Sequence, residues 1–372
     1  MHIVFRTDAS IQIGTGHVVR DLTLANKLFS LGVRITFICR EHPGNLCEFI
    51  EKAGYQLVRL ATPSSDSVSN ALVHSSWLGA SQEEDALKTL ERLDEIGGCD
   101  WLIVDHYAID ITWEKIVRQL AKKIMVIDDL ADRSHDCDLL LDQNFYQGVD
   151  ARYDKLVSSQ CIKLLGPHYA MLRPEFSIAL SKMKIRTGKL QRILVFFGAT
   201  DSNNETLKVL HAFQLLNRPE ITVHVILGIN HPFKSDVRNF ASSMKQVVCH
   251  DYVENMAELM IDSDLYLGAA GTTTWERCCL GLPSLVIAVA SNQIGPIEQL
   301  SHAGIVRFLG EGGSVTAEYI ARALNEVLAT PSALAEMSRN SMRLVDGQGV
   351  QRCVSAILNY GEVNEETIQN YT

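Results

Sequence analysis

The stretch LYLGAAGTTTWERCCLGLPSLVIAVASNQ, residues 265–293, decides the fold. Its apolar runs at 265–267 and 284–289 are short and end at Gly, Pro or small polar residues, which is typical of buried strands. Between the two runs lies a segment of helical length that opens after a glycine-containing turn. Two strands joined through a helix pair in parallel, so the stretch predicts a parallel α/β sheet.

The same alternation recurs along the chain. Predicted strands lie at 3–5, 33–39, 56–59, 101–104, 124–127, 139–141, 192–197, 222–227, 246–249, 265–267, 284–289 and 306–309. Amphipathic, helix-like segments lie at 17–31, 45–53, 82–96, 112–120, 316–328, 331–345 and 351–359. Alternation of this kind indicates a parallel sheet with helices on both faces. We therefore expect an α/β protein with two Rossmann-like domains that face each other across a cleft.

The boundary between these domains is predicted near Gly188. The preceding segment, 166–188, contains two X-Pro pairs and ends in a basic run without strand character, as an interdomain connection does. Residues 1–188 are therefore assigned to an N-terminal Rossmann-like domain with its linker, and residues 189–372 to a C-terminal one. The last twelve residues are polar and are expected to fray.

Composition excludes several classes of protein. The 372 residues carry a formal net charge of −10, which gives no electrostatic footprint for nucleic acid. The apolar runs are far shorter than the roughly 20 residues that span a bilayer, and the N-terminus lacks a signal-peptide core. We expect a cytoplasmic protein with neither nucleic acid nor membrane as a partner. The nine cysteines have no zinc spacing and are expected to be buried free thiols.

The loop Gly14-Thr15-Gly16-His17 joins a predicted strand to a predicted helix. Such a loop presents backbone N–H groups at the positive end of a helix dipole, where an anion can bind. Val19 stands where a dinucleotide fingerprint has its third glycine, and the Lys-Ser/Thr pair of a P-loop is missing. The sequence therefore excludes both of these nucleotide motifs.

His17 stands at the start of that helix. The dipole disfavours an imidazolium there, so the ring stays neutral as a general base must. Arg20 lies one turn further along the same face. Spacing leaves a second interpretation open, in which His17 only caps the helix in a satisfied polar contact.

The turn at 268–276 has small residues that allow a phosphate to approach the backbone, and threonine hydroxyls that add donors. A capping box formed by Thr273 and Glu276 explains the same residues without a ligand, so both interpretations stay open. After the next strand, the amides of Asn292 and Gln293 are available to a sugar or to solvent.

Two acidic groups remain. Asp128 and Asp129, with Asp132 and His135, resemble a metal site, but adjacent carboxylates at a strand end point to opposite faces, and no metal is expected. The group Asp105-His106-Tyr107 is ambiguous, because the tyrosine either donates to a ligand or packs at the edge of the cleft.

At these residues the chain resembles the UDP-2,4-diacetamido-2,4,6-trideoxy-β-L-altropyranose hydrolases of pseudaminic acid biosynthesis. The resemblance covers both predicted domains and departs at Asp21, where a cysteine is common in the family. It rests on RTDAS (6–10) with IGTGH (13–17) and Arg20, VDHY (104–107), IDDLADR (127–133) with DQN (142–144), and GAAGTTTWERCCLGLP (268–283) with Asn292-Gln293.

The resemblance implies a glycosyltransferase B-like fold, and hydrolysis of a UDP-sugar at its anomeric carbon with inversion, without metal or other cofactor. His17 matches the family's base, Glu276 its ribose ligand, and the segment 252–256 would present backbone groups to uracil. The substrate-binding residues implied are Gly14, Thr15, Gly16, Arg20, Asp105, Tyr107, Asp129, Asn144, Gly198, Val253, Met256, Gly271, Thr272, Thr273, Glu276, Asn292 and Gln293.

Other functions fit the same motifs. A UDP-sugar-dependent glycosyltransferase has the same fold and nucleotide site and differs in its acceptor, and a UDP-sugar 2-epimerase keeps UDP on its product. A UDP-sugar-binding module would sense the ligand without cleaving it. A related spore-coat polysaccharide group has similar motifs, so a neighbouring UDP- or CMP-sugar is also a candidate. The sequence does not indicate the oligomeric state.

Overall fold

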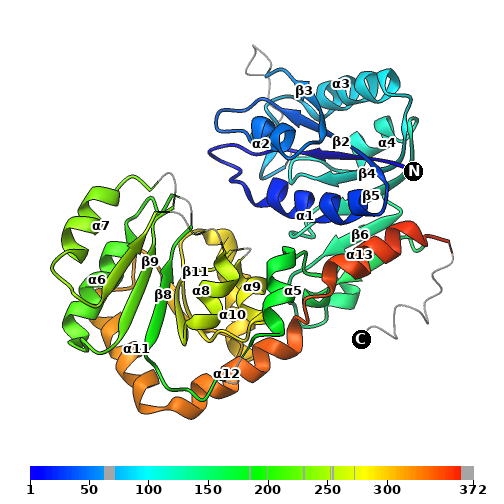
Figure 1. Ribbon diagram of the computed structural model, residues 1–372. Helices are drawn as coiled ribbons and strands as arrows, with labels where there is room; N and C mark the ends of the chain where they lie inside the picture. Colours follow the sequence, from blue (N-terminus) through cyan, green and yellow to red (C-terminus); the bar gives the residue numbers. More distant parts are fainter. Residues whose placement is uncertain are drawn as a thin grey trace. The chain divides into compact units, whose positions relative to one another are not determined.

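The structure is a computed structural model that describes residues 1–62, 72–183, 186–198, 200–228, 231–251, 253, 255–271 and 273–361, without the side chains of residues 150 and 292. The chain divides into two compact units (Figure 1). Unit 1 consists of the described residues of 1–144, 148–171 and 348–372, and unit 2 of those of 145–147 and 172–347.

Unit 1 is built on one parallel sheet with the strand order β3-β2-β1-β4-β5-β6-β7. The crossover at β1 places β2 and β4 on either side of it, as in a doubly wound fold. The strands are β1 (His2–Thr7), β2 (Arg34–Arg40), β3 (Gln56–Leu60), β4 (Cys99–Asp105), β5 (Ala121–Ile127), β6 (Leu139–Asp142) and β7 (Ile162–Leu165).

Alternate residues of these strands form two cores. Ile3 and Phe5 of β1 pack with α1 (Gly16–Ser30), α2 (Cys47–Lys52) and α13 (Gly349–Leu358). Val4, between them, points to the other face and packs with α3 (Gln82–Glu95) and α4 (Ile111–Val117). This follows from the two-residue period of a strand, and it leaves the carboxyl ends of the strands as the edge from which polar side chains emerge. Short 3₁₀ turns lie at Ser75–Leu78, Val149–Ala151 and Pro167–Tyr169.

Unit 2 repeats the plan with a parallel sheet of order β10-β9-β8-β11-β12-β13 (Figure 1). Its strands are β8 (Arg192–Phe196), β9 (Thr222–Ile226), β10 (Val247–His250), β11 (Leu265–Ala269), β12 (Ser284–Ala288) and β13 (Arg307–Glu311). Its helices are α5 (Pro174–Leu180), α6 (Glu205–Leu216), α7 (Lys234–Ala241), α8 (Met256–Asp262), α9 (Thr273–Cys279), α10 (Ile294–His302), α11 (Ala317–Ala329) and α12 (Pro331–Leu344), with a 3₁₀ turn at Ser291–Gln293.

In the second sheet, too, successive side chains of a strand point to opposite faces. Val195 and Leu267 belong to an apolar core that they share with α6, α7 and α11. Tyr266, which points the other way, lies under α9, and on that side α5 contacts α8 and α9 while α12 contacts α9.

The predicted α/β fold with two parallel-sheet domains is confirmed. The twelve predicted strands correspond to β1–β6 and β8–β13. Strand β7 was not predicted: it has only four residues, one of them Lys163, and it ends directly before Gly166-Pro167, so its apolar pattern is brief.

The domain boundary differs from the prediction at Gly188. Helix α5, placed in the linker by the sequence, lies in unit 2, where it packs against α8 and α9. Helix α13, placed in the C-terminal domain, lies in unit 1, because Val350, Cys353 and Ile357 complete the apolar core over α1. An amphipathic pattern identifies a helix but not the sheet that it covers.

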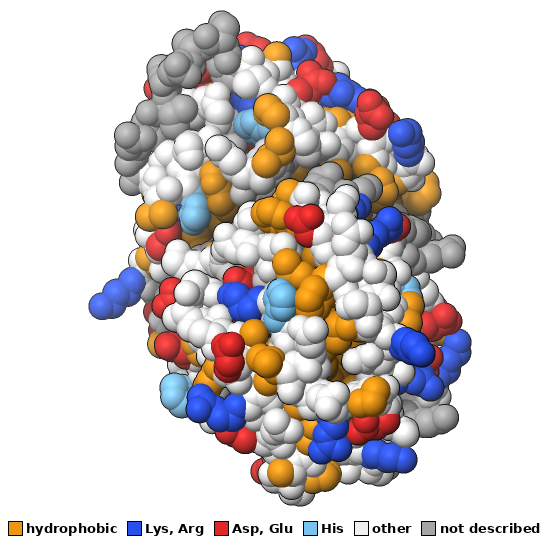
Figure 2. All heavy atoms as spheres, turned by 90° about the vertical axis from the view of Figure 1, so that its left-hand side faces the viewer, with side chains coloured by type: hydrophobic (Ala, Val, Ile, Leu, Met, Phe, Trp, Pro, Cys, Tyr) orange, Lys and Arg blue, Asp and Glu red, His pale blue; other side chains and the backbone are white. Residues whose placement is uncertain are grey.

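Three features of the described residues bear on the expectations from composition: the length of the helices, the surface charges and the cysteines. Among the described residues, no helix is both long enough and apolar enough to cross a membrane. On the face drawn in Figure 2, basic and acidic side chains are interspersed. All nine cysteines are free thiols, and all but Cys249 are buried, as predicted.

A substitution at Gly188 tests whether this residue packs inside unit 2. Its φ is +84°, and a Cβ added there would lie 1.9 Å from the carbonyl oxygen of Pro331. We expect Gly188→Ala to lower the free energy of unfolding by more than about 3 kcal/mol, measured by urea denaturation with circular dichroism.

Gly304 is the matched control in the same unit. Its φ is +69°, and an added Cβ would meet only the amide nitrogen of Asn340, at 3.1 Å. Gly304→Ala should cost about 1–2 kcal/mol, the conformational strain alone. Equal losses in the two variants would contradict a close packing of Gly188 on Pro331.

Candidate active site

The loop after β1 is a tight turn that delivers the start of α1. The hydroxyl oxygen of Ser10 accepts from the backbone N–H groups of Gln12 and Ile13, at 3.1 and 2.9 Å. Gly14, with φ +81°, donates its N–H to the carbonyl of Ser10 at 2.9 Å. The turn leaves Thr15 exposed and begins α1 at Gly16, so that His17 is the second residue of the helix.

His17 forms a short hydrogen bond with the end of β4. Its Nδ1 lies 2.6 Å from Oδ1 of Asp105, and both side chains are buried. A carboxylate only accepts, so Nδ1 carries the hydrogen and Nε2 keeps a lone pair when the ring is neutral. The ring therefore bonds across to the sheet, and the interpretation of His17 as a helix cap is wrong.

Arg20 completes the hold on this carboxylate. Its Nη2 and Nε donate to the two oxygens of Asp105, both at 2.6 Å, and its Nη1 donates to Asp129 at 2.7 Å. Burial alone would raise the pKa of Asp105, but the neighbouring Arg20 and His17 outweigh it and hold that pKa well below its usual value. Asp105 is consequently an anion at neutral pH.

Asp129 joins the remaining predicted side chains. It accepts from Arg20, from the hydroxyl of Tyr107 and, at 2.8 Å, from the side-chain amide of Asn144. The ring of Tyr107 packs edge-on against His17, with 4.6 Å between the ring centroids. One connected network thus runs from His17 to Asn144.

The structure brings together six of the residues predicted from sequence: His17, Arg20, Asp105, Tyr107, Asp129 and Asn144. For two of them it changes the predicted role. Asp105 is fully buried and Arg20 nearly so, with every guanidinium nitrogen donating to an aspartate. These two residues orient His17 and do not line a ligand surface.

Two aromatic neighbours of Tyr107 were not predicted from the sequence. The ring of Trp77 stacks on Tyr107 at 5.7 Å, and the ring of His74 lies 5.6 Å from Tyr107 and 4.4 Å from Trp77. Both are partly exposed. Trp77 beside His74 was the signal available, but Tyr107 is 30 positions away from Trp77 in the chain.

The acidic cluster after β5 has divergent partners. Asp128 pairs with Arg133 at 2.9 Å and turns away from Asp129, as expected for neighbours on a strand end. Asp132 pairs with Arg133, and His135 bonds to Glu114 at 2.7 Å. Within the described ranges, no three His, Cys, Asp or Glu side chains come together as a metal site.

In unit 2, Glu276 of α9 is held by a residue from the predicted linker. Arg173 donates from Nη2 to Oε1 of Glu276 at 3.2 Å, while Oε2 is buried without a partner among the described residues. Burial raises the pKa of Glu276, and the charge of Arg173 opposes this shift. Glu276 does not reach back to the N–H of Thr273, which is the first residue of α9, so a capping box is not formed.

The other predicted residues of unit 2 lie at strand ends and helix starts. Gly271 is exposed, and Gly198 has φ +91° with open space where a side chain would be. Met256 begins α8, and Gln293 turns its Oε1 back to the N–H of Val289 at 3.0 Å. Val253 is partly exposed, whereas Thr272 and the side chain of Asn292 lie outside the described residues.

Beneath this region lies a buried arginine. The guanidinium of Arg277 stacks on Tyr266 at 3.9 Å from the ring centroid and donates to the hydroxyl of Thr274 at 2.9 Å. Its Nε and Nη1 have no partner among the described residues. Burial lowers the pKa of Arg277, since no carboxylate neutralises its charge at hydrogen-bond distance.

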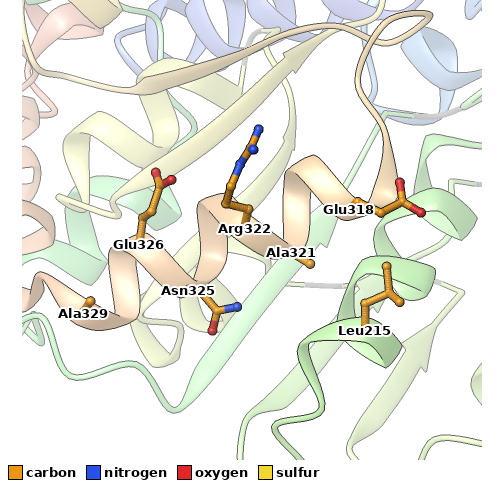
Figure 3. A pocket seen from close by; sticks show the side chains of 7 residues that line it. All are labelled: Leu215, Glu318, Ala321, Arg322, Asn325, Glu326 and Ala329. Carbon is orange, nitrogen blue, oxygen red and sulfur yellow. The ribbon is translucent and has the colours of Figure 1, made fainter.

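A separate hollow of about 530 Å³ lies on unit 2 beside α11 and α6 (Figure 3). None of the predicted site residues lines it; its lining residues are Leu215, Glu318, Ala321, Arg322, Asn325, Glu326 and Ala329. Glu326 pairs with Arg307, and Arg322 packs over Tyr319. We therefore place the candidate site at the strand ends and not in this hollow.

Known proteins resemble the chain over these same elements. Residues 192–352 match the glycosyltransferase family 28 C-terminal domain. The uncharacterized protein MJ1062 of Methanocaldococcus jannaschii is 27% identical over 295 residues, which are 77% of this chain and 55% of that protein. The chain thus spans about half the length of that relative.

Two further proteins are similar along most of their length. The UDP-2,4-diacetamido-2,4,6-trideoxy-β-L-altropyranose hydrolase of Campylobacter jejuni is 26% identical over 82% of this chain and 97% of its own. The crystal structure of MurG from Acinetobacter baumannii superposes with a TM-score of 0.70 at 12% identity, covering 96% of this chain and 99% of that one. The second likeness shows the glycosyltransferase B-type fold.

Asp142 at the end of β6 adds a pH dependence to the network. It accepts from the backbone and side-chain amides of Asn144 at 2.9 and 3.1 Å, and from the hydroxyl of Tyr153 at 3.0 Å. Burial and then the charge of Asp129 raise its pKa to about 7. The folded state therefore binds a proton between pH 4 and 7 that the unfolded state releases, and stability falls as the pH rises through this window.

We expect Asp142→Asn to remove this dependence. Between pH 5 and pH 8 the wild type should lose up to about 3 kcal/mol more unfolding free energy than the variant. Urea denaturation in a Trp275→Phe background measures this, since the remaining tryptophans Trp77, Trp101 and Trp113 all lie in unit 1. Parallel pH profiles of the two proteins would show that Asp142 is ionised throughout.

Proposed function

We propose that the protein hydrolyses a UDP-linked 2,4-diacetamido-2,4,6-trideoxy sugar at its anomeric carbon, with inversion, releasing UDP and the free sugar for pseudaminic acid biosynthesis. The observation that carries the proposal is the 2.6 Å bond between Nδ1 of His17 and Asp105, which leaves Nε2 as the basic nitrogen. The relative from C. jejuni named for this hydrolysis, similar along 97% of its length, supports the choice of substrate.

His17 is the general base of this mechanism. Nε2 takes a proton from a water molecule while the water oxygen attacks the anomeric carbon from the face opposite the phosphate. Asp105 stabilises the imidazolium that forms, as an orienting carboxylate does in a His–Asp pair. General base catalysis of this kind contributes roughly 10²- to 10⁴-fold in rate.

The leaving group needs little assistance, because UDP departs as a stable anion. We assign its diphosphate to the turn of Gly271, Thr272 and Thr273, with Gly198 beside it, and its uracil to Val253 and Met256. Arg173 occupies Oε1 of Glu276, so the buried and unpartnered Oε2 is available to accept from a ribose hydroxyl.

The sugar is assigned to polar groups at the strand ends. These are Gly14, Thr15 and Gly16 with Tyr107 and Asn144 in unit 1, and Asn292 and Gln293 in unit 2. The hydroxyl of Tyr107 already donates to Asp129, so we assign its ring, and not its hydroxyl, to the contact with the sugar. No metal or other cofactor takes part in the proposed reaction, since water activation is assigned to His17 and charge stabilisation to the turn.

Glycosyl transfer is the second candidate. The match of residues 192–352 to a glycosyltransferase family favours it, because this match covers the half of the chain that we assign to UDP. The two functions differ in the acceptor, and a 2-epimerase differs from both in keeping UDP on its product.

A proton NMR time course with the UDP-diacetamido-trideoxy-altrose substrate, EDTA and no acceptor tests the proposal. We expect UDP and a free sugar, with the sugar first appearing as the inverted anomer. A UDP-linked product would indicate epimerisation, and no reaction until an acceptor sugar is added would indicate transfer. Activity that is lost in EDTA and restored by Mg²⁺ would contradict the metal-free mechanism.

The base is tested by His17→Ala. We expect UDP affinity to stay within about twofold while kcat falls by roughly 10²-fold or more, because only the proton acceptor is removed. His302→Asn, an exposed histidine of unit 2, is the control and should leave both unchanged. Unchanged turnover in His17→Ala would refute the assignment of the base.

A further inference from the structure

Asp21 is a buried carboxyl group that the proposed mechanism does not use. It lies one turn after His17 on α1 and directly after Arg20. Its side chain is fully buried, and neither carboxyl oxygen has a hydrogen-bond partner within the described part of the chain. Burial of a carboxylate without donors costs several kcal/mol, so the ionised form is disfavoured at this position.

Among the described residues no cation lies at hydrogen-bond distance from the carboxyl of Asp21, although the charge of the neighbouring Arg20 opposes the rise in its pKa. Arg20 directs Nε and Nη2 to Asp105 and Nη1 to Asp129, which uses all three of its nitrogens. Thr7 and Asp105 are paired neighbours at the ends of β1 and β4, and both act on the carboxyl of Asp21; the hydroxyl of Thr7 is itself buried and unpaired among the described residues.

Two neighbouring carboxyl groups in such a site cannot both ionise. Asp105 holds the charge, because His17 and Arg20 donate to it through three bonds of 2.6 Å. Burial and the charge of Asp105 raise the pKa of Asp21 well above its usual value. Burial and the neighbouring charge of Asp105 thus favour the neutral acid form of Asp21, whose O–H would have Asp105 as its acceptor.

We propose that Asp21 is a positioning residue which, as a neutral acid, donates its O–H to Asp105 and so limits the hold of Asp105 on the proton of His17. This rests on the proposed role of His17 as a general base. With three donors, Arg20, His17 and Asp21, the carboxylate of Asp105 attracts each of them less strongly. Asp105 then stabilises the imidazolium of His17 less strongly. If the donor Asp21 is lost, Asp105 attracts the remaining two more strongly.

Other groups also act on this ring and are left in place by the test. They are Arg20 on α1, His106 and Tyr107 after β4, Asp129 after β5, and His74 before the 3₁₀ turn at Ser75–Leu78. The Asp21 variants keep all of these side chains, so a change in the titration of His17 reports on the loss of the Asp21 carboxyl.

Asp21→Asn and Asp21→Ala test whether Asp21 is a neutral donor or an ionised carboxylate. The amide of Asn is neutral and still donates to Asp105, so the NMR titration midpoint of the His17 Hε1 signal should stay within about 0.2 pH units of the wild type. Alanine removes the donor, and we expect a midpoint about 0.5–1 pH unit higher. Disappearance of the signal in His17→Ala assigns it.

Two results would overturn the proposal. A lower midpoint in Asp21→Asn would mean that Asp21 is ionised in the wild type and that the substitution removes a negative charge. An unchanged midpoint in Asp21→Ala would mean that Asp21 does not act on Asp105. If the alanine variant does not fold, Asp21→Leu, of similar length and without a donor, takes its place.

The kinetic readout is the pH profile of kcat/KM for hydrolysis of the UDP-sugar. Asp21→Ala should lose about 3- to 10-fold at acidic pH and recover at alkaline pH, since only the protonation of the base has changed. A loss of equal size at every pH would indicate a structural defect and would refute the proposal. The titration needs no substrate, so a wild type that hydrolyses nothing refutes the proposed function and leaves this inference testable.

Discussion

The carboxylate of Asp105 is the interaction on which the site in unit 1 depends. It stands at the carboxyl end of β4, next to β1 in the centre of the sheet, and accepts from His17 and Arg20 of α1. The same bonds fix the tautomer of the His17 ring and the rotamer of Arg20. Arg20 also donates to Asp129 and so fixes the position of that carboxylate. Because the carboxylate is fully buried, removal of Arg20 would leave its charge without a cation paired to it in the protein interior.

The parallel fold could be predicted from the sequence because each βαβ unit is local. Residues 265–293 contain a strand, a turn, a helix and the next strand, and the structure has β11, α9 and β12 in those places. The unit to which α5 and α13 belong is not determined by the neighbouring sequence. Their apolar faces would cover either sheet, and the choice depends on contacts such as Cys353 with the core over α1, nearly 330 positions from Leu24.

For the candidate site, too, one part could be predicted from the sequence and another could not. Its members were predicted because polar residues at the carboxyl ends of parallel strands meet at one edge. Their roles were not, because a role depends on which partner each side chain reaches. Asp105, 88 positions from His17, was expected to bind substrate and instead orients the histidine. No sequence pattern distinguished Arg173 as the partner of Glu276, or showed that Asp21 would have no donor.

The balance of buried charge differs between the two units and agrees with the proposed division of labour. In unit 1 the buried arginines Arg6, Arg20, Arg40 and Arg133 each pair with aspartates. In that arrangement the positive charge of each buried arginine is offset by carboxylates, so among the described residues of that unit no unpaired buried cation competes with proton uptake by His17. In unit 2, Arg277 is buried on the ring of Tyr266 with no carboxylate at hydrogen-bond distance among the described residues. The charge of Arg277 beside Thr274 would lower the free energy of an anion at the turn to which we assign the diphosphate, and this local effect does not depend on the net charge of −10.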